Sequence, residues 1–275
     1  GATLGPLVGA QFLLHAQDIP EASLQQLKPD QLTAFLNAEA QLVKTPYLCL
    51  AILFLVLGLC LLFIPLPTLT ENGETSARLK DILGFRHTVL GALGVFCYLG
   101  AEVGIVSFLI RYARSEKLPG LSEQKAALFI TLFMALVLLG RLAGAWLLQQ
   151  VDSARLLTRC AAGAGLLVII AMLTTGYVSL YALSCVGLFT SVMYPILFTL
   201  SIHQLGAYTK TGSSLLIMSI VGGALIPPIM GLISDTLSIR LAFTVPVLCY
   251  SYILYYGLRG YITSQPVRTQ TILNH

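Results

Sequence analysis

The chain has 275 residues, of which 56% are hydrophobic and only 10% are charged, and its formal net charge is +4. A soluble domain of this size would carry about 25% charged residues, so the composition excludes an ordinary soluble globular protein. The basic residues form neither a patch nor an aromatic–basic module, which also excludes a nucleic-acid partner. We expect an all-α protein whose main partner is the lipid bilayer.

The first fourteen residues, Gly1–Leu14, are apolar but follow no Met, carry no basic segment and show no cleavage signature. They are therefore not a signal peptide. Glycines at positions 1, 5 and 9 form a stripe of small residues, as found where transmembrane helices pack closely. Because fourteen residues are too few to cross a bilayer, we expect the end of a helix whose beginning, with everything before it, is missing.

Six uncharged runs follow, and several approach the roughly 20 residues that a spanning helix needs. The run 160–202 is too long for one crossing, and the cluster of turn formers and β-branched residues at 174–179 predicts a break. Splitting that run gives seven predicted spans. The uncharged runs are Thr45–Thr70, His87–Ile110 apart from Glu102, Ala126–Gly140 with an extension past Arg141 to Val151, Cys160–Ile202, Thr211–Ser234 and Leu241–Leu258.

Glu102 is the single charged residue in the second of these runs. A carboxylate at membrane depth costs several kcal/mol unless it faces a cavity, a partner or a substrate, so Glu102 is a candidate functional residue. Gly100 and Gly104 flank it on one helical face, where a neighbouring helix or a ligand can approach the backbone.

The motifs of soluble enzymes and metal proteins are missing from the sequence. All six cysteines lie in apolar runs without a C-x-x-C spacing, which favours packing over a disulfide or a metal site. No serine-hydrolase elbow, zinc-protease motif or phosphate-binding glycine loop is present, so we expect no catalytic residue. An intramembrane enzyme remains an alternative without its usual residues.

Several segments resemble one family of membrane carriers, the fucose permease and glucose/galactose transporter family of the major facilitator superfamily. The seventh helix of that family is resembled by Phe96–Glu102 followed by Ser107–Ala113. The end of its eighth helix is similar to Gly140-Arg141 with Gly144–Trp146. Its tenth and eleventh helices, with their short loop, are resembled by Met193–Leu200, Leu205-Gly206, Thr209-Lys210, Gly212–Ser214 and Ile220–Pro227 through Gly231 to Asp235.

The resemblance implies a twelve-helix fold of two six-helix halves, of which this chain is the carboxy-terminal part. Residues 1–67 are then the end of the amino-terminal bundle, comprising the end of helix five, a loop and helix six. A cytoplasmic linker follows at 68–86, the carboxy-terminal six-helix bundle at 87–260, and a cytoplasmic tail at 261–275. The implied location is the bacterial inner membrane, with many crossings, and we expect a monomer.

The resemblance also implies a function, the import of a hexose such as fucose, galactose or glucose by alternating access. No cofactor is expected; a proton, or else sodium, is the coupling ion. The family's proton-coupling carboxylates lie in its first and fourth helices, which this chain lacks. An alternative from another class is a non-transporting membrane sensor or scaffold on the same helices.

Four residues are candidates for sugar binding: Glu102, Tyr194, Tyr98 and Phe108. The glucose/galactose type resembles the chain with Glu at position 102, and the fucose type with Gln. Glu102 is interpreted as a hydrogen-bonding partner of the sugar, with a share in ion coupling or a structural pairing with Tyr98 as alternatives. Tyr194 either contacts the sugar or supports the helix kink at Pro195, and Phe108 either stacks on the sugar or packs.

Two further groups are candidates for moving parts. Gly222-Gly223 with Pro227-Pro228 predicts a flexible break in the eleventh helix, which is either a hinge or a close helix contact, and Pro195 is a second candidate hinge. Arg141 with Asp152 is a candidate cytoplasmic clamp, as in a loop motif of the superfamily, although the full Gly-Asp-Arg pattern is absent.

Overall fold

The computed structural model describes residues 79–115 and 123–262, together with helical residues between 44 and 60. The chain divides into two compact units, Gly1–Gly73 and Glu74–His275, and the boundary falls within the predicted linker 68–86. In the first unit, residues 51–56 and 58–60 are helical and lie inside the predicted span Thr45–Thr70. The predicted helix end at Gly1–Leu14 lies outside the described residues.

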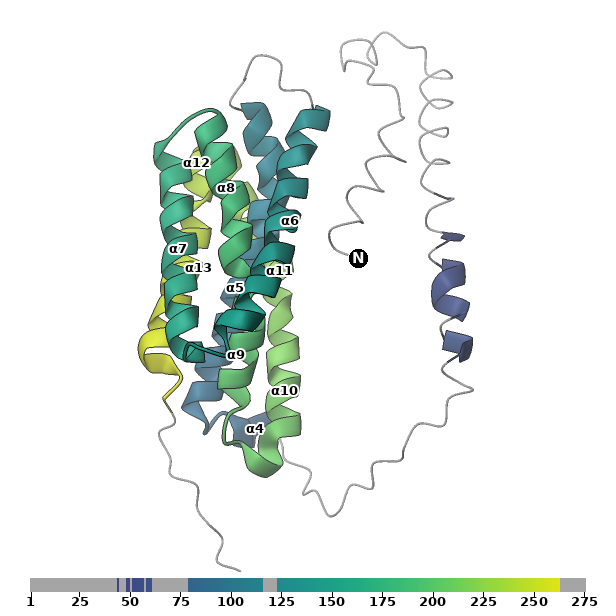
Figure 1. Ribbon diagram of the computed structural model, residues 1–275, viewed down its shortest axis with the longest axis vertical. Helices are drawn as coiled ribbons and strands as arrows, with labels where there is room; N and C mark the ends of the chain where they lie inside the picture. Colours follow the sequence, from purple (N-terminus) through teal and green to yellow (C-terminus); the bar gives the residue numbers. More distant parts are fainter. Residues whose placement is uncertain are drawn as a thin grey trace, which may run out of the picture. The chain divides into compact units, whose positions relative to one another are not determined.

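The second unit is a bundle of long helices that run side by side (Figure 1). In chain order its elements are α4 (Leu79–Ile82), α5 (Arg86–Ser115), α6 (Glu123–Leu147), α7 (Ser153–Leu173), α8 (Tyr177–Thr190), α9 (Met193–Ile202), η1 (Gly206–Tyr208), α10 (Thr209–Met218), η2 (Ser219–Val221), α11 (Gly222–Thr236), α12 (Ile239–Ala242), α13 (Thr244–Tyr255) and the π-helical η3 (Tyr256–Gly260).

Six of the seven predicted spans are confirmed, because six stretches of the described chain are long and apolar enough to cross a membrane. The predicted break inside 160–202 is also confirmed, since α7 ends at Leu173 and α8 begins at Tyr177. The main difference is the start of α7 at Ser153, well before the uncharged run, because the helix includes Arg155 and Arg159.

Glycines bring the central helix α5 close to α11. A Cβ at Gly100 would lie 2.8 Å from Cβ of Ile226, and one at Gly104 would lie 2.5 Å from the Met230 sulfur. In the other direction, a Cβ at Gly222 would overlap the backbone carbonyl of Phe96. The prediction that the Gly100 and Gly104 face admits a neighbouring helix is therefore confirmed, and the neighbour is α11.

The predicted break in the eleventh helix lies elsewhere than expected. Helix α11 continues through Pro227 and Pro228 without interruption, and the irregular turn is η2, immediately before Gly222. Pro227 and Pro228 are the sixth and seventh residues of α11, so each removes one backbone hydrogen bond inside the helix, to the carbonyls of Gly223 and Ala224, without ending it. The Gly222 contact with α5 supports close packing at this point.

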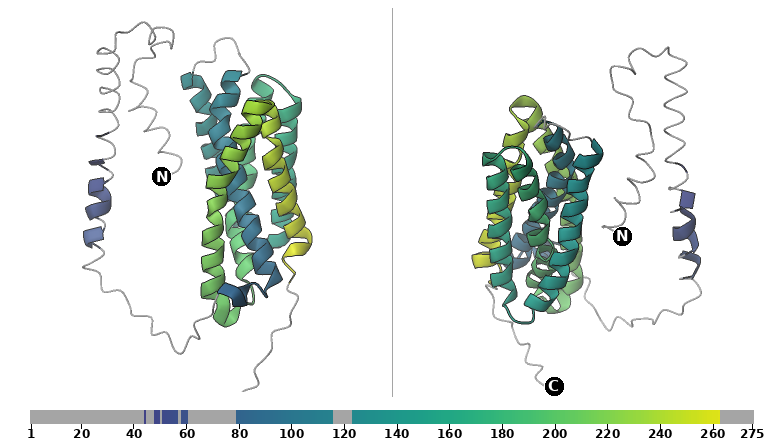
Figure 2. Two further views of the ribbon diagram at one scale, coloured as in Figure 1. Left: turned by 180° about the vertical axis from the view of Figure 1, so that it is seen from behind. Right: turned by 45° about the horizontal axis from the view of Figure 1, so that its top comes forward.

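A buried hydrogen-bond network joins α5, α9 and η3. It lies at the end of the bundle that carries α4, which we call the linker end and which is at the bottom of the bundle in the left view of Figure 2. His87 Nε2 donates to the carbonyl of His203 at 3.0 Å, and Thr88 Oγ1 donates to the carbonyl of Ser201 at 2.9 Å. The Tyr256 hydroxyl lies 3.0 Å from Ser201 Oγ and donates to the His87 carbonyl at 3.3 Å. Every side chain of this network has a partner.

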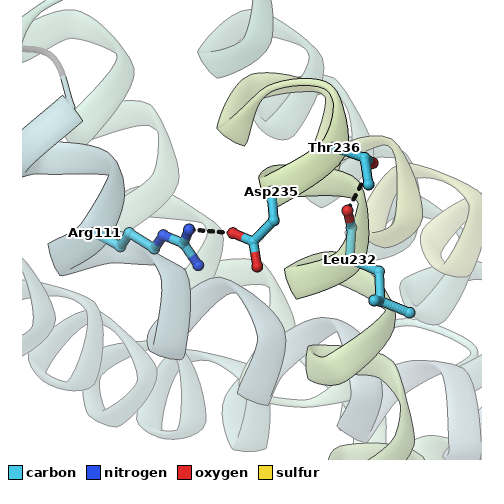
Figure 3. A network of polar contacts seen from close by, with 4 residues as sticks. All are labelled: Arg111, Leu232, Asp235 and Thr236. Atoms are coloured by element: carbon cyan, nitrogen blue, oxygen red, sulfur yellow. Dashed lines mark hydrogen bonds and ion pairs between the residues drawn. The ribbon is translucent and has the colours of Figure 1, made fainter.

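At the other end of the bundle, away from the linker end, an ion pair between Arg111 and Asp235 joins α5 and α11 (Figure 3). The Arg111 guanidinium also lies 5.7 Å from the centroid of the Phe108 ring. Both members of the ion pair are more than half exposed, so it stabilises this end only modestly.

Candidate functional site

A cavity of about 670 Å³ opens beside the middle of α5. Its volume lies within the range of about 300–1,000 Å³ that is usual for small-molecule sites. The cavity brings together side chains from α5, α6, η2, the turn between α8 and α9, and the start of α9. They are Tyr98, Leu99, Glu102, Arg141, Ala145, Leu148, Ser191, Val192, Tyr194, Pro195 and Ile220.

Glu102 is the acidic residue of this cavity, and it is half-buried in the bundle. Its carboxylate interacts with the Tyr98 hydroxyl, one helical turn earlier, and with the positive charge of Arg141 on α6. It forms no direct ion pair with Arg141. A carboxylate and a guanidinium therefore line one cavity without pairing directly, and a polar ligand in the cavity can contact both.

Tyr194 lines the cavity beside a break between α8 and α9, in the segment that resembles the family's tenth helix. Helix α8 ends at Thr190 and α9 begins at Met193, and Ser191 Oγ donates to the Leu188 carbonyl at 2.7 Å. Pro195 cannot donate to the residue four positions earlier, which explains why the helix is interrupted here. The Tyr194 and Tyr98 rings lie with their centroids 6.1 Å apart, so two aromatic faces border the same space.

Tyr250 on α13 is a polar residue near this site that the sequence analysis missed. The residue is 1% exposed, and its hydroxyl has no hydrogen-bond partner in the described part of the chain. The Glu102 carboxylate is close enough to interact electrostatically with this hydroxyl. No signal in the sequence singles out this tyrosine, because the same apolar span carries several others.

Other candidate residues lie elsewhere. Phe108 does not line the cavity; it is buried, 4.0 Å from the position of a Cβ at Gly231. Arg141 and Asp152 are not brought together, because Arg141 lines the central cavity and Asp152 caps the start of α7. They form no ion pair with each other in this structure, and the clamp stays a prediction. Gly223 is less confined than Gly222, since a Cβ there would lie 3.2 Å from the Val103 side chain and no closer than 3.7 Å to Leu99.

The cavity offers the chemistry that a polyhydroxylated ligand needs. A carboxylate, a guanidinium, a serine hydroxyl and phenols can exchange hydrogen bonds with hydroxyl groups, and the two tyrosine rings can cover C–H faces. The described residues contain no cluster of three or more His, Cys, Asp or Glu side chains suited to a metal ion.

A membrane-spanning helical bundle is typical of secondary transporters when a cavity near mid-span holds a few polar side chains and is bordered by an interrupted helix. The chain belongs to the Major Facilitator Superfamily, whose family pattern matches residues 1–220. The resemblance drawn from the sequence, and the fold that it implied, are therefore confirmed.

Relatives of known name agree with this family. The chain is 37% identical over 262 residues to a glucose/galactose transporter of Brucella abortus, a match that covers 94% of this chain and 60% of the relative. It is 33% identical over 268 residues to the L-fucose-proton symporter of Escherichia coli, which covers 94% and 60% respectively. A crystal structure of the Escherichia coli fucose:proton symporter, FucP, matches with a TM-score of 0.75 and 31% identity, over 92% of this chain and 64% of that one. The chain thus spans about three-fifths of the length of these relatives.

Proposed function

We propose that this chain is part of a proton-coupled hexose transporter of the bacterial inner membrane, which imports fucose, galactose or glucose by alternating access. The observation that carries the proposal is the convergence of Glu102, Tyr98 and Tyr194 on one cavity at mid-span. Glucose/galactose transport and fucose–proton symport in the named relatives support the same class of substrate.

In this proposal Glu102 and Arg141 replace part of the water shell of the sugar, and the two tyrosine rings cover its C–H surfaces. Arg141 and Pro195 are exposed in the isolated bundle, so the cavity is open on the side where a second bundle would close it. Rocking of two bundles about such a site would expose it to one side of the membrane at a time. Neither an enzymatic reaction nor a cofactor is part of this mechanism.

Transport by the full-length protein in inverted or right-side-out vesicles tests the proposal. Addition of fucose, galactose or glucose should make the medium outside right-side-out vesicles more alkaline, because protons enter with the sugar. Labelled sugar should accumulate at the same time. Sugar binding without proton movement or accumulation would instead indicate a sensor, and chemical conversion of the sugar would indicate an enzyme.

A further inference from the structure

A second cavity, of about 460 Å³, lies at the linker end between the beginning of α7 and η3. It shares no lining residue with the central cavity and has no part in the proposed transport site. Its walls are formed by two turns of α7 on one side and by the last turn of the final span on the other.

The close approach of these two elements depends on Gly257. A Cβ at this position would lie 2.7 Å from Thr158 Oγ1 and 3.4 Å from the carbonyl of Ala154. The chain continues through the π-helical turn η3, and the Tyr261 N–H donates to the Tyr256 carbonyl at 3.2 Å. This turn places Tyr261 at the cavity, and π-helical turns are frequent at functional sites.

Two arginines give the cavity its charge. Arg155 and Arg159 are four residues apart, so their side chains project from the same face of α7. Both are exposed, and neither forms an ion pair with a residue in the ranges 79–115 and 123–262. The one acidic group, Asp152, accepts the backbone N–H of Arg155 at 3.3 Å as a helix cap. The charged lining residues therefore carry a net positive charge.

The position of the cavity identifies what could neutralise this charge. The span that contains both arginines begins at Ser153, and the last span ends at Gly260, so the cavity lies at the ends of two spans, where we expect the bundle to meet the headgroups of the bilayer. Leu258 lines the same cavity and is 56% exposed, which adds an apolar contact beside the two guanidiniums. Arginine binds phosphate oxygens in a bidentate manner, and basic pockets between spanning helices suit lipid headgroups.

We propose that this cavity binds the phosphate group of an anionic membrane phospholipid through Arg155 and Arg159, with Leu258 against its acyl chains. A phospholipid bound there would link the beginning of α7 to the end of the last span from outside the bundle. Phosphate oxygens could also come from free inorganic phosphate, and the experiment separates the two sources.

Native mass spectrometry of the purified full-length protein measures the lipid that it retains from mixed micelles. Wild-type protein should retain phosphatidylglycerol in preference to phosphatidylcholine. The double substitution Arg155→Gln and Arg159→Gln should reduce phosphatidylglycerol retention at least tenfold, and Lys at both positions should restore part of it because the charge returns. Arg259→Gln, the same charge change at a neighbouring residue that does not line the cavity, should stay within twofold of wild type.

Wild-type protein gives a second measurement that needs no folded variant. Phenylglyoxal modifies accessible arginines, and peptide mapping should show slower modification of Arg155 and Arg159 in phosphatidylglycerol than in phosphatidylcholine. Equal rates in the two lipids, or a Gln double variant that retains phosphatidylglycerol as wild type does, would overturn the proposal. Equal protection by inorganic phosphate without anionic lipid would overturn the assignment to a phospholipid.

Discussion

The linker-end network and the central cavity are two regions of one apolar bundle that contain polar side chains. They differ in whether those side chains have hydrogen-bond partners within the protein. At the linker end, the Tyr256 hydroxyl reaches both Ser201 and the His87 carbonyl, so its hydrogen bonds are made within the protein. Near the cavity, the Tyr250 hydroxyl, which does not line it, has no partner among the described residues, and Glu102 and Arg141 line the cavity without a direct ion pair.

This difference in hydrogen bonding suggests a structural role for the network and a functional role for the cavity. A buried polar group without a partner costs about 1–3 kcal/mol, so such groups are rare unless something else uses them. Tyr250 and Tyr256 make the contrast sharp, because both are fully buried tyrosines in the same span and differ mainly in whether the hydroxyl is partnered. The network is expected to govern stability, and the cavity to govern sugar binding.

The largest effect on stability is expected from Gly91→Ala. The added Cβ would overlap Ser201 Oγ and would lie 2.9 Å from the Tyr256 hydroxyl, in the middle of the network. Overpacking of this kind costs about 3 kcal/mol, so thermal unfolding of the detergent-purified protein should occur at a clearly lower temperature. Gly94→Ala is the matched control, since its Cβ would meet only a Leu197 methyl group at 3.0 Å. Equal stability of the two variants would contradict the network's role.

The pair Tyr256→Phe and Tyr250→Phe tests the comparison itself. Removing the Tyr256 hydroxyl breaks two hydrogen bonds and should lower the free energy of unfolding by about 0.5–1.5 kcal/mol for each bond, with sugar affinity unchanged. Removing the Tyr250 hydroxyl takes away an unpartnered group, so stability should stay the same or rise while transport falls. Melting curves and sugar uptake on both variants decide; a Tyr250→Phe variant that loses stability would show that its hydroxyl has a structural partner.

A smaller effect, confined to sugar affinity, is expected from Tyr194→Phe. The ring and its contact with Tyr98 remain, and only the hydroxyl is lost. A phenol that binds sugar should lose about 0.5–1.5 kcal/mol, or roughly two- to tenfold in affinity, without a change in melting temperature. Calorimetric sugar binding and a melting curve on the same preparation distinguish the two roles. If stability falls while affinity holds, Tyr194 supports the break before Pro195 instead.

The smallest effect is expected from Arg111→Gln at the opposite end of the bundle. Its ion pair with Asp235 is exposed to solvent, and pairs of this kind contribute about 0–1 kcal/mol. The melting temperature should fall less than in Tyr256→Phe, and the difference from wild type should shrink in high salt because salt screens exposed charges. A loss as large as that of Gly91→Ala would mean that this ion pair, and not the buried network, holds the bundle together.

Sequence reasoning found the spans because a bilayer imposes one rule on them, a run of about 20 apolar residues. It also found Glu102, because a lone carboxylate in such a run has a high cost. The start of α7 was predicted too late because Arg155 and Arg159 precede the uncharged run and were not counted as part of the span. A helix can extend beyond the bilayer core, where long cationic side chains reach water.

Positions that depend on the neighbouring helix could not be found in this way. Arg141 was predicted to form a clamp with Asp152, but the packing of α6 on α5 places Arg141 in the lining of the central cavity. Pro227 and Pro228 suggested a break, but α11 continues through both of them, and the irregular turn is η2, before Gly222. The partnering of Tyr256 and the isolation of Tyr250 are set by which helices face them, and no spacing in the sequence records that.

Hexose binding to full-length protein with substitutions at Glu102 tests the central claim most directly, that this cavity holds the sugar. A hydrogen bond to a charged group contributes about 1.5–3 kcal/mol, so Glu102→Ala should weaken equilibrium binding about ten- to hundredfold. Glu102→Gln, which keeps an acceptor oxygen, should lose less. Wild-type affinity in Glu102→Ala would contradict the account, because the sugar would then bind elsewhere.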